Sequence, residues 1–447
     1  MEFKEFQRFV AQAAKRAGIE DFELYYASEE STEVNMFNGE ITDFTASLTG
    51  GVAFRCIVEG HMGSAYTQDL SPEQAESLVL RAQDNARTLE KEEEAFFAEG
   101  GGTYPDCKPV DMPVLAPEEL IRTARAAGDA LKVSHEKITD QCTTEAVTQQ
   151  TETCLVNSRG VDLSWHGSVD AVIMSAVVSD GEETNDDYDV KAGAPADLDL
   201  KAMAEKTAAR AAAMLGAGVA PTGACPVIFA PAAMYSLVLT FASAFSAENA
   251  RKGLSALRGK EGETIAAACV TLTDDPFYPG SAYPKPFDGE GSPTARKELI
   301  SRGVLNTLLY DLSSAHAAGK KTTGNASRGS YDSPVSIQPY TLVLAPGELT
   351  EAELLEKCGN GVWIDSLGGT HAGANPISGD FSLQSSGFLV EGGKKTAPVR
   401  AFTVSGNFFD LLKQITALSD TVELPRVGLP AVASPAVLVT GLTISGK

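Results

Sequence analysis

The chain has 447 residues, with 36 Lys and Arg side chains against 60 Asp and Glu side chains, a formal net charge of −24. This excess disfavours direct binding to nucleic acid or to an anionic membrane, because both need clustered basic side chains. No apolar run reaches the ~18 residues of a membrane-spanning helix. At roughly 150 residues per domain, the length predicts two or three domains.

Helices and strands alternate in the first part of the chain. Apolar residues recur at helical spacing over Phe6–Ala14, and Gly18 is a plausible stop, which predicts an amphipathic helix. The pair Asn38-Gly39 predicts a hairpin turn between strands. The strands are expected at residues 22–27, 33–37, 41–48 and 51–58.

Ser71 can cap a second helix, and Pro72 suits its first position. That helix runs toward an acidic run at 90–94, which we expect to be solvated. A third helix is predicted at 117–132 and strands within 137–178. The acidic segment 179–189 lacks the spacing of a calcium loop, so we expect a solvated loop there.

An Ala-rich helix is expected at 198–215, followed by Gly- and Pro-containing residues that we interpret as a domain boundary. A buried strand at 225–230, an apolar helix at 232–249 and many strands with Gly/Pro turns come next. The predicted fold class is therefore α+β. It comprises an N-terminal mixed domain with antiparallel strands at 1–218 and a strand-rich C-terminal domain at 219–447.

The usual catalytic patterns are missing from the sequence. The seven cysteines include no CxxC pair, which disfavours a zinc site or a disulfide framework and favours a reducing cytoplasm. The five histidines are far apart, and neither GxxxxGK[ST] nor GxSxG occurs. The residues alone thus favour a binding or interaction role.

Several stretches that span nearly the whole chain carry a family resemblance. They are Gly51–Ala65, Val156–Gly160, Arg251–Ser255 with Thr273–Pro276, Phe287–Gly291 with Lys297–Tyr310 and Thr323–Ala326, His371–Pro376 with Ser378–Ser382, and Ser405–Asp410. In this order they resemble the TldD/PmbA family, also called modulator of DNA gyrase, and in particular its PmbA/TldE branch.

The resemblance implies a metallopeptidase context. TldD-type chains bind zinc through an HExxxH helix and a C-terminal cysteine. Counted back from the Arg-Lys-Gly segment that begins at Arg251, the histidine positions fall near Val238 and Ser243, and the glutamate position falls near Leu239. Residues 419–447 contain no cysteine. We therefore expect no catalytic residue and no metal in this chain, with zinc in a TldD-like partner.

The implied function is that of a non-catalytic PmbA/TldE-type subunit of a zinc metallopeptidase complex that acts on unfolded peptides. The resemblance implies peptide precursors and a labile antitoxin as substrates. Candidate peptide-binding residues are Gly369, His371, Asn375 and Asp380, in a Gly-rich stretch that lets a backbone approach closely. These residues can equally fix turns. Asp288 and Glu290, in a Gly-flanked turn, are expected to be structural.

Two other functions stay open at this point. One is a self-sufficient metallopeptidase with scattered ligands such as His166, His316 or His371. The other is a peptide-binding or scaffolding homodimer with no role in proteolysis. A companion chain that carries HExxxH would favour the complex over the homodimer. In each case a cytoplasmic location is expected.

Overall fold

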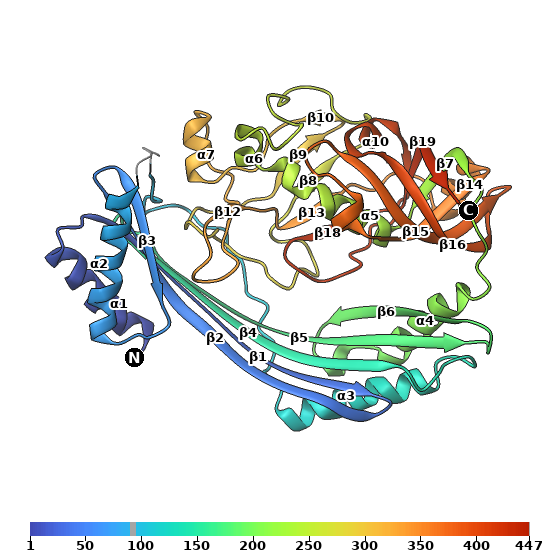
Figure 1. The fold of residues 1–447 in the computed structure, drawn as a ribbon, viewed down its shortest axis with the longest axis horizontal. Coiled ribbons are helices and arrows are strands. Elements are labelled where there is room, and N and C mark those ends of the chain that lie inside the picture. Colours follow the sequence, from blue (N-terminus) through green and yellow to red (C-terminus); the bar gives the residue numbers. More distant parts are fainter. Residues whose placement is uncertain (90–94, 447) are drawn as a thin grey trace.

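The computed structural model describes residues 1–89 and 95–446, so the acidic run at 90–94 lies outside the described residues. Figure 1 shows a long curved sheet from the first part of the chain and a strand-rich second part that lies across one of its faces. Helices combine with mainly antiparallel sheets, which confirms the α+β fold class. No helix among the described residues is long and apolar enough to cross a membrane.

The first sheet is antiparallel throughout and has the order β3-β2-β1-β4-β5-β6. Its strands are β1 Asp21–Phe37, β2 Glu40–Val58, β3 His61–Thr67, β4 Thr143–Asn157, β5 Asp162–Ser179 and β6 Thr184–Ala192.

The Asn38-Gly39 hairpin is confirmed, but it joins two long strands where four were predicted. Both turn residues have positive φ, 49° at Asn38 and 80° at Gly39, as a type I′ turn requires. The polar stretches at 28–32 and 49–50, which the sequence presents as breaks, continue the strands. They can do so because β1 pairs along this length with both β2 and β4, which satisfies its backbone groups.

The acidic segment 179–189 is not a loop throughout, so that prediction is wrong for its second half. After a turn at 180–183 the chain forms β6, with Asp186 opposite Val177 and Tyr188 opposite Ser175 of β5. β6 is an outer strand of the sheet. Carboxylates suit an outer strand because they discourage its pairing with another chain.

Helices cover one face of this sheet: α1 Phe3–Arg16, α2 Pro72–Thr88, α3 Pro117–Lys132 and α4 Leu200–Ala213. All four agree with the predicted helices, and Ser71 caps α2 by accepting from Gln74 N at 3.4 Å. Successive strand residues point to opposite faces. Leu24 packs under α1 and α2, whereas Tyr25 faces the second part of the chain.

The second part contains a six-stranded sheet, β16-β15-β14-β7-β19-β17, and a five-stranded sheet, β10-β9-β8-β13-β18. The six strands are β7 Gly223–Phe229, β14 Gly361–Gly368, β15 Asp380–Glu391, β16 Lys394–Asn407, β17 Ile415–Leu418 and β19 Val437–Ser445. The five are β8 Leu272–Asp274, β9 Lys297–Ser301, β10 Val304–Leu305, β13 Thr341–Leu344 and β18 Ala431–Ala433. β11 Ala326–Ser327 and β12 Ser336–Ile337 form a separate pair.

The main core lies between these two sheets, where Phe229 of β7 and Leu342 of β13 belong to one buried apolar cluster. Helices α5 and α10 add to this cluster, and α8 covers the other face of the six-stranded sheet. The helices of this part are α5 Pro231–Phe241, α6 Ala247–Arg251, α7 Leu312–Ala317, α8 Glu351–Cys358, α9 Thr370–Gly373 and α10 Phe408–Gln414. Short 3₁₀ turns are η1 Pro195–Asp197 and η2 Ala242–Phe245.

The single apolar helix predicted at 232–249 is wrong, because the segment divides into α5, η2 and α6. Ser246 adopts an extended conformation, and its side chain accepts from Asn249 N at 3.3 Å. It therefore caps a new helix and ends the preceding one.

Candidate functional site

The segment around Val238 and Ser243, where the resemblance predicts the counterparts of zinc ligands, packs largely in the apolar core. Val238 on α5 is only 3% exposed, Leu239 is half-buried against the same cluster, and Ser243 on η2 is exposed. Phe241 stacks on Phe408 with ring centroids 4.5 Å apart. Aliphatic side chains donate no lone pair, and zinc needs several N, S or O ligands in tight geometry. The residues present do not fit a zinc ion.

The scattered histidines lie on separate elements. His166 is exposed on β5, His316 on α7 lies against Phe96 with ring centroids 4.2 Å apart, and His371 is exposed on α9. Within residues 1–89 and 95–446, no three His, Cys, Asp or Glu side chains gather closely enough to hold a metal ion. The geometry therefore gives no support to a metal site built from these histidines.

The predicted peptide-binding residues share one turn segment, which contacts α5 through α9. Gly369 precedes α9 with φ 72°, a conformation that favours glycine. Asn375 Oδ1 accepts from Ile377 N at 3.0 Å, and Asp380 accepts from Ser378 Oγ at 2.8 Å. Of the four, His371 has its side chain exposed and outside these turn bonds.

Asp380 is also held by Asn407, whose Nδ2 donates to its carboxylate at 2.9 Å. This hydrogen bond and the one from Ser378 lower the pKa of Asp380. The carboxylate and the Asn375 amide thus order the turn between α9 and β15. Whether the segment also contacts a peptide stays a prediction.

A cleft of about 640 Å³ lies between the first sheet and the second part of the chain. Tyr25 of β1 and Thr151 of β4 line one side, and Lys285 and Arg328 line the other. A smaller cavity of about 60 Å³ continues from it, since Tyr25, Lys285 and Arg328 line both. Most of the cleft's other lining side chains are uncharged and polar: Ser28, Thr49, Gln68, Gln149, Thr153, Tyr283, Ser327, Ser330, Tyr331 and Gln338.

A buried ion cluster joins the two parts beside the cleft. Glu23 of β1 is fully buried, and its Oε1 accepts from Arg55 Nε at 3.0 Å and from Arg328 Nη2. The Arg328 guanidinium lies 4.3 Å from the centre of the Tyr25 ring. One carboxylate thus faces two guanidinium groups.

Two more carboxyl groups are buried nearby. Asp288 accepts from the backbone N–H groups of Glu290 and Ser292 at 2.9 Å and of Ala326 at 3.0 Å, which confirms its structural role in the turn. Burial raises the pKa of Asp288 to about 6. Burial also raises the pKa of Glu290 to about 8, and Arg55, 4.0 Å away, opposes this shift.

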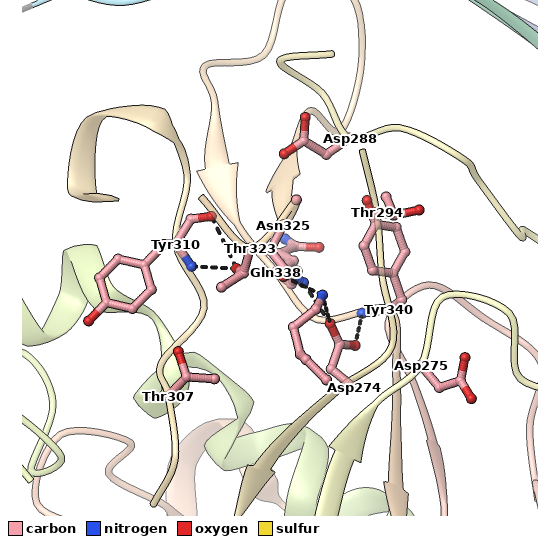
Figure 2. A network of polar contacts seen from close by, with 12 residues as sticks. Asp274, Asp275, Asp288, Thr294, Thr307, Tyr310, Thr323, Asn325, Gln338 and Tyr340 are labelled. Carbon is pink, nitrogen blue, oxygen red and sulfur yellow. Dashed lines mark hydrogen bonds and ion pairs between the residues drawn. The ribbon is translucent and has the colours of Figure 1, made fainter. Parts of the chain in front are cut away.

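A polar network lies behind Ala326 and Tyr340, which line the smaller cavity. Asn325 Nδ2 donates to the buried Asp274 at 2.7 Å, and its Oδ1 accepts from Lys297 Nζ at 2.7 Å. Asp274 also accepts from Tyr340 N at 2.7 Å. Figure 2 shows Asn325 between Asp274 and Asp288. This network fixes β11, and therefore the position of Arg328, which directly follows it.

Sequence reasoning missed the cleft and its charges. Glu23 and Arg328 are 305 residues apart in the chain. No local spacing brings them together. The only available signal is the alternation of β1, which places Glu23 and Tyr25 on the face opposite to Leu24.

Comparison with known proteins identifies the family. Models of PmbA/TldA metallopeptidase domains match domain 1 over residues 22–86, the central domain over 112–215 and the C-terminal domain over 222–446. The interval between the last two matches falls in the Gly/Pro segment interpreted above as a boundary.

Relatives match over most of their length. Metalloprotease PmbA of Escherichia coli O157:H7 is 26% identical over 393 residues, 86% of this chain and 84% of that protein. A crystal structure of a Thermotoga maritima protein described as a modulator of DNA gyrase has a TM-score of 0.89 at 29% identity, covering 99% of this chain and 100% of that one. TldE from Thermococcus kodakarensis shares the fold, with a TM-score of 0.88 at 23% identity and 99% coverage of both chains. The resemblance found in the sequence is confirmed, and the chain belongs to the PmbA/TldD metallopeptidase family.

Proposed function

We propose that this chain is a PmbA/TldE-type subunit without its own metal centre, which acts with a TldD-like zinc metallopeptidase chain on unfolded peptides. Maturation of peptide precursors and turnover of an antitoxin are the processes in which such a complex would act. A cytoplasmic location belongs to the same proposal and is supported by seven free cysteines.

The observation that carries this proposal is the chemistry of the α5–η2 segment. The positions aligned with the ligands hold Val238, Leu239 and Ser243, of which Val238 is buried in an apolar cluster. A catalytic zinc needs three protein ligands and a general base for its water. Since the chain has none of these there, the proposal assigns hydrolysis to the partner.

The cleft supports a role in holding peptide. Its polar side chains are mostly hydroxyl and amide groups, which can bond to the main chain of a peptide without selecting its sequence. The turn at 369–380 lies beside α5, with His371 exposed, and is kept in the proposal as a predicted peptide contact.

The test combines metal analysis with partner capture. The purified full-length chain is expected to contain well below one zinc per chain and to leave unfolded casein uncleaved. Capture of the tagged chain from its native host is expected to recover a similar-sized protein that carries HExxxH. The joint sample should bind zinc and cleave casein, and chelation should abolish the cleavage.

Two results would contradict the proposal. Stoichiometric zinc in the isolated chain, with chelator-sensitive cleavage, would show a self-sufficient peptidase. Repeated recovery of the chain alone, as a homodimer that binds peptide, would favour the scaffolding function.

A further inference from the structure

Two cations in the smaller cavity have incomplete pairing. The Arg328 side chain is only 1% exposed, and its Nε, which is buried, has no hydrogen-bond partner among the described residues. Its one anionic contact, Glu23 Oε1, is shared with Arg55. Lys285 lines the same cavity, and no described carboxylate lies within 4.0 Å of its Nζ.

The local charge is therefore opposite to that of the whole chain. Arg55, Arg328 and Lys285 carry positive charge, while Glu23 and Asp288 are the anions beside them. Burial raises the pKa of Glu290 to about 8, which favours its neutral form. Burial lowers the pKa of Lys285, so its charge is held there at a desolvation cost that an anion would relieve. The cavity itself is lined by Lys285 and Arg328 against Asp288, whereas Glu29 and Glu152 line the adjoining cleft. In a chain of net charge −24, the excess of cations is thus confined to the smaller cavity.

We propose that the cavity lined by Lys285 and Arg328 is an anion subsite that binds a carboxylate group of a peptide lying in the cleft. Lys285 Nζ would donate to the carboxylate oxygens in a charge-assisted hydrogen bond, and the Arg328 guanidinium would be the second cation beside it. Ser327 and Gln338, which line the cavity, are the neutral donors beside them.

The size of the cavity restricts what can enter. Its volume of about 60 Å³ admits a small terminal group but not a continuing chain, whereas the adjoining cleft of about 640 Å³ admits an extended peptide. A C-terminal carboxylate and the carboxylate of an Asp or Glu side chain both satisfy this limit. Both have the same chemistry, and the experiment below separates them.

The anion subsite is inferred from this chain alone. The inference that its ligand is a peptide rests on the proposed function. The measurement therefore uses the isolated full-length chain and needs neither zinc nor a partner. If no partner is captured, the proposed function fails, but the isolated chain can still prefer a carboxylate peptide. If the chain shows no such preference, the subsite fails, but the proposed complex can still form.

The probes are three fluorescein-labelled octapeptides of Ser, Thr, Ala and Gly, compared by fluorescence anisotropy. One has a free C-terminus, one a C-terminal amide, and one an amide with a Glu at its last position. The protein variants are Lys285→Met, which removes the buried charge at similar volume, and Lys394→Met. The latter is a matched control at the exposed β15–β16 turn. Thermal melting checks that both variants fold.

A carboxylate peptide is expected to bind wild type about tenfold more tightly than the plain amide, as one charge-assisted hydrogen bond predicts. Lys285→Met should abolish this preference, and Lys394→Met should retain it. A preference for the free C-terminus or for the Glu amide identifies the source of the carboxylate. Equal binding of all three peptides, absence of saturable binding at about 1 mM, or an unchanged preference in Lys285→Met would overturn the proposal.

Discussion

The raised pKa of the buried Glu290 has a consequence for stability. Burial raises its pKa from 4.5 to about 8. Between these values the folded chain holds a proton that the unfolded chain has released, so this group's contribution makes the fold less stable as the pH rises from about 4.5 to about 8. Glu290→Gln mimics the protonated acid and removes this dependence.

We therefore expect the free energy of unfolding of wild type to fall relative to Glu290→Gln between about pH 5 and pH 8, by at most about 1.4 kcal/mol per pH unit. Urea unfolding at a series of pH values measures it. Glu298 is an exposed glutamate on β9, and the free energy of unfolding of Glu298→Gln should change with pH as that of wild type does. A constant offset for Glu290→Gln at all pH values would contradict the assignment.

Phe241, between Leu239 and Ser243 in the sequence, packs in the apolar core. It is fully buried, stacked on Phe408, and 6.3 Å from Phe381 by ring centroids. Phe241→Ala should cost about 3–5 kcal/mol of unfolding free energy, because it leaves a cavity in the core. Ser243→Ala, two residues on and exposed, should change it by less than about 0.5 kcal/mol. Similar values for the two variants in urea unfolding would show that the segment is not a packed core.

At the scale of elements, α2 lies unusually close to β3 at Gly63. A Cβ added there would stand 2.0 Å from the Ala82 carbonyl oxygen and 2.6 Å from Ala86 N. Gly63→Ala must therefore push the helix away from the sheet, and we expect a loss of about 1–3 kcal/mol.

Gly128 on α3 provides the matched control for the same substitution. Its Cβ would find only Thr144 Oγ1, at 3.7 Å. Gly128→Ala should therefore stabilise the chain by up to about 1 kcal/mol through helix propensity. The melting temperature should be lower than that of wild type for Gly63→Ala and higher for Gly128→Ala. Equal shifts of the two melting temperatures would mean that helix propensity, and not the space around the glycine, determines the stability of both variants.

Elements with strong local signals were predictable from the sequence. The bounds of α3, Pro117–Lys132, agree with the predicted helix, because Pro at its start and apolar periodicity fix it locally. β6 and the break before Ser246 were missed. The pairing of β6 depends on β5, and the start of α6 depends on one side-chain cap within an otherwise apolar run. Strand pairing therefore decided the first, and a local side-chain cap decided the second.

The candidate site was less predictable than the fold. The apolar character of Val238 and Leu239 could be found from the sequence, because it follows from residue type. That these positions correspond to zinc ligands stays a prediction of the resemblance. The cleft could not be found, because Tyr25, Lys285 and Arg328 meet only after the two parts of the chain pack together. The spacing of these residues along the sequence does not predict that contact.

For the whole molecule, Glu23 is a fully buried anion that links the two parts. Glu23→Gln leaves Arg55 and Arg328 without their shared counter-charge in a buried place, which should cost about 3 kcal/mol. We expect a lower urea midpoint and faster proteinase K cleavage in the connecting segment 216–222. Glu20→Gln, at an exposed position just before β1, should leave both unchanged. Unaltered cleavage in Glu23→Gln would show that the other contacts between the parts, such as the ion pair of Arg400 with Glu183, hold them together without it.

The position of β19 imposes an order on folding. Although it is the last strand of the described chain, it lies inside the six-stranded sheet, between β7 and β17. During synthesis on the ribosome, β7 therefore has an open edge until residues 437–445 emerge. The first sheet, whose strands end at Ala192, has no such dependence and can form early. The nascent second part is thus the portion that a chaperone must shield from pairing with other chains.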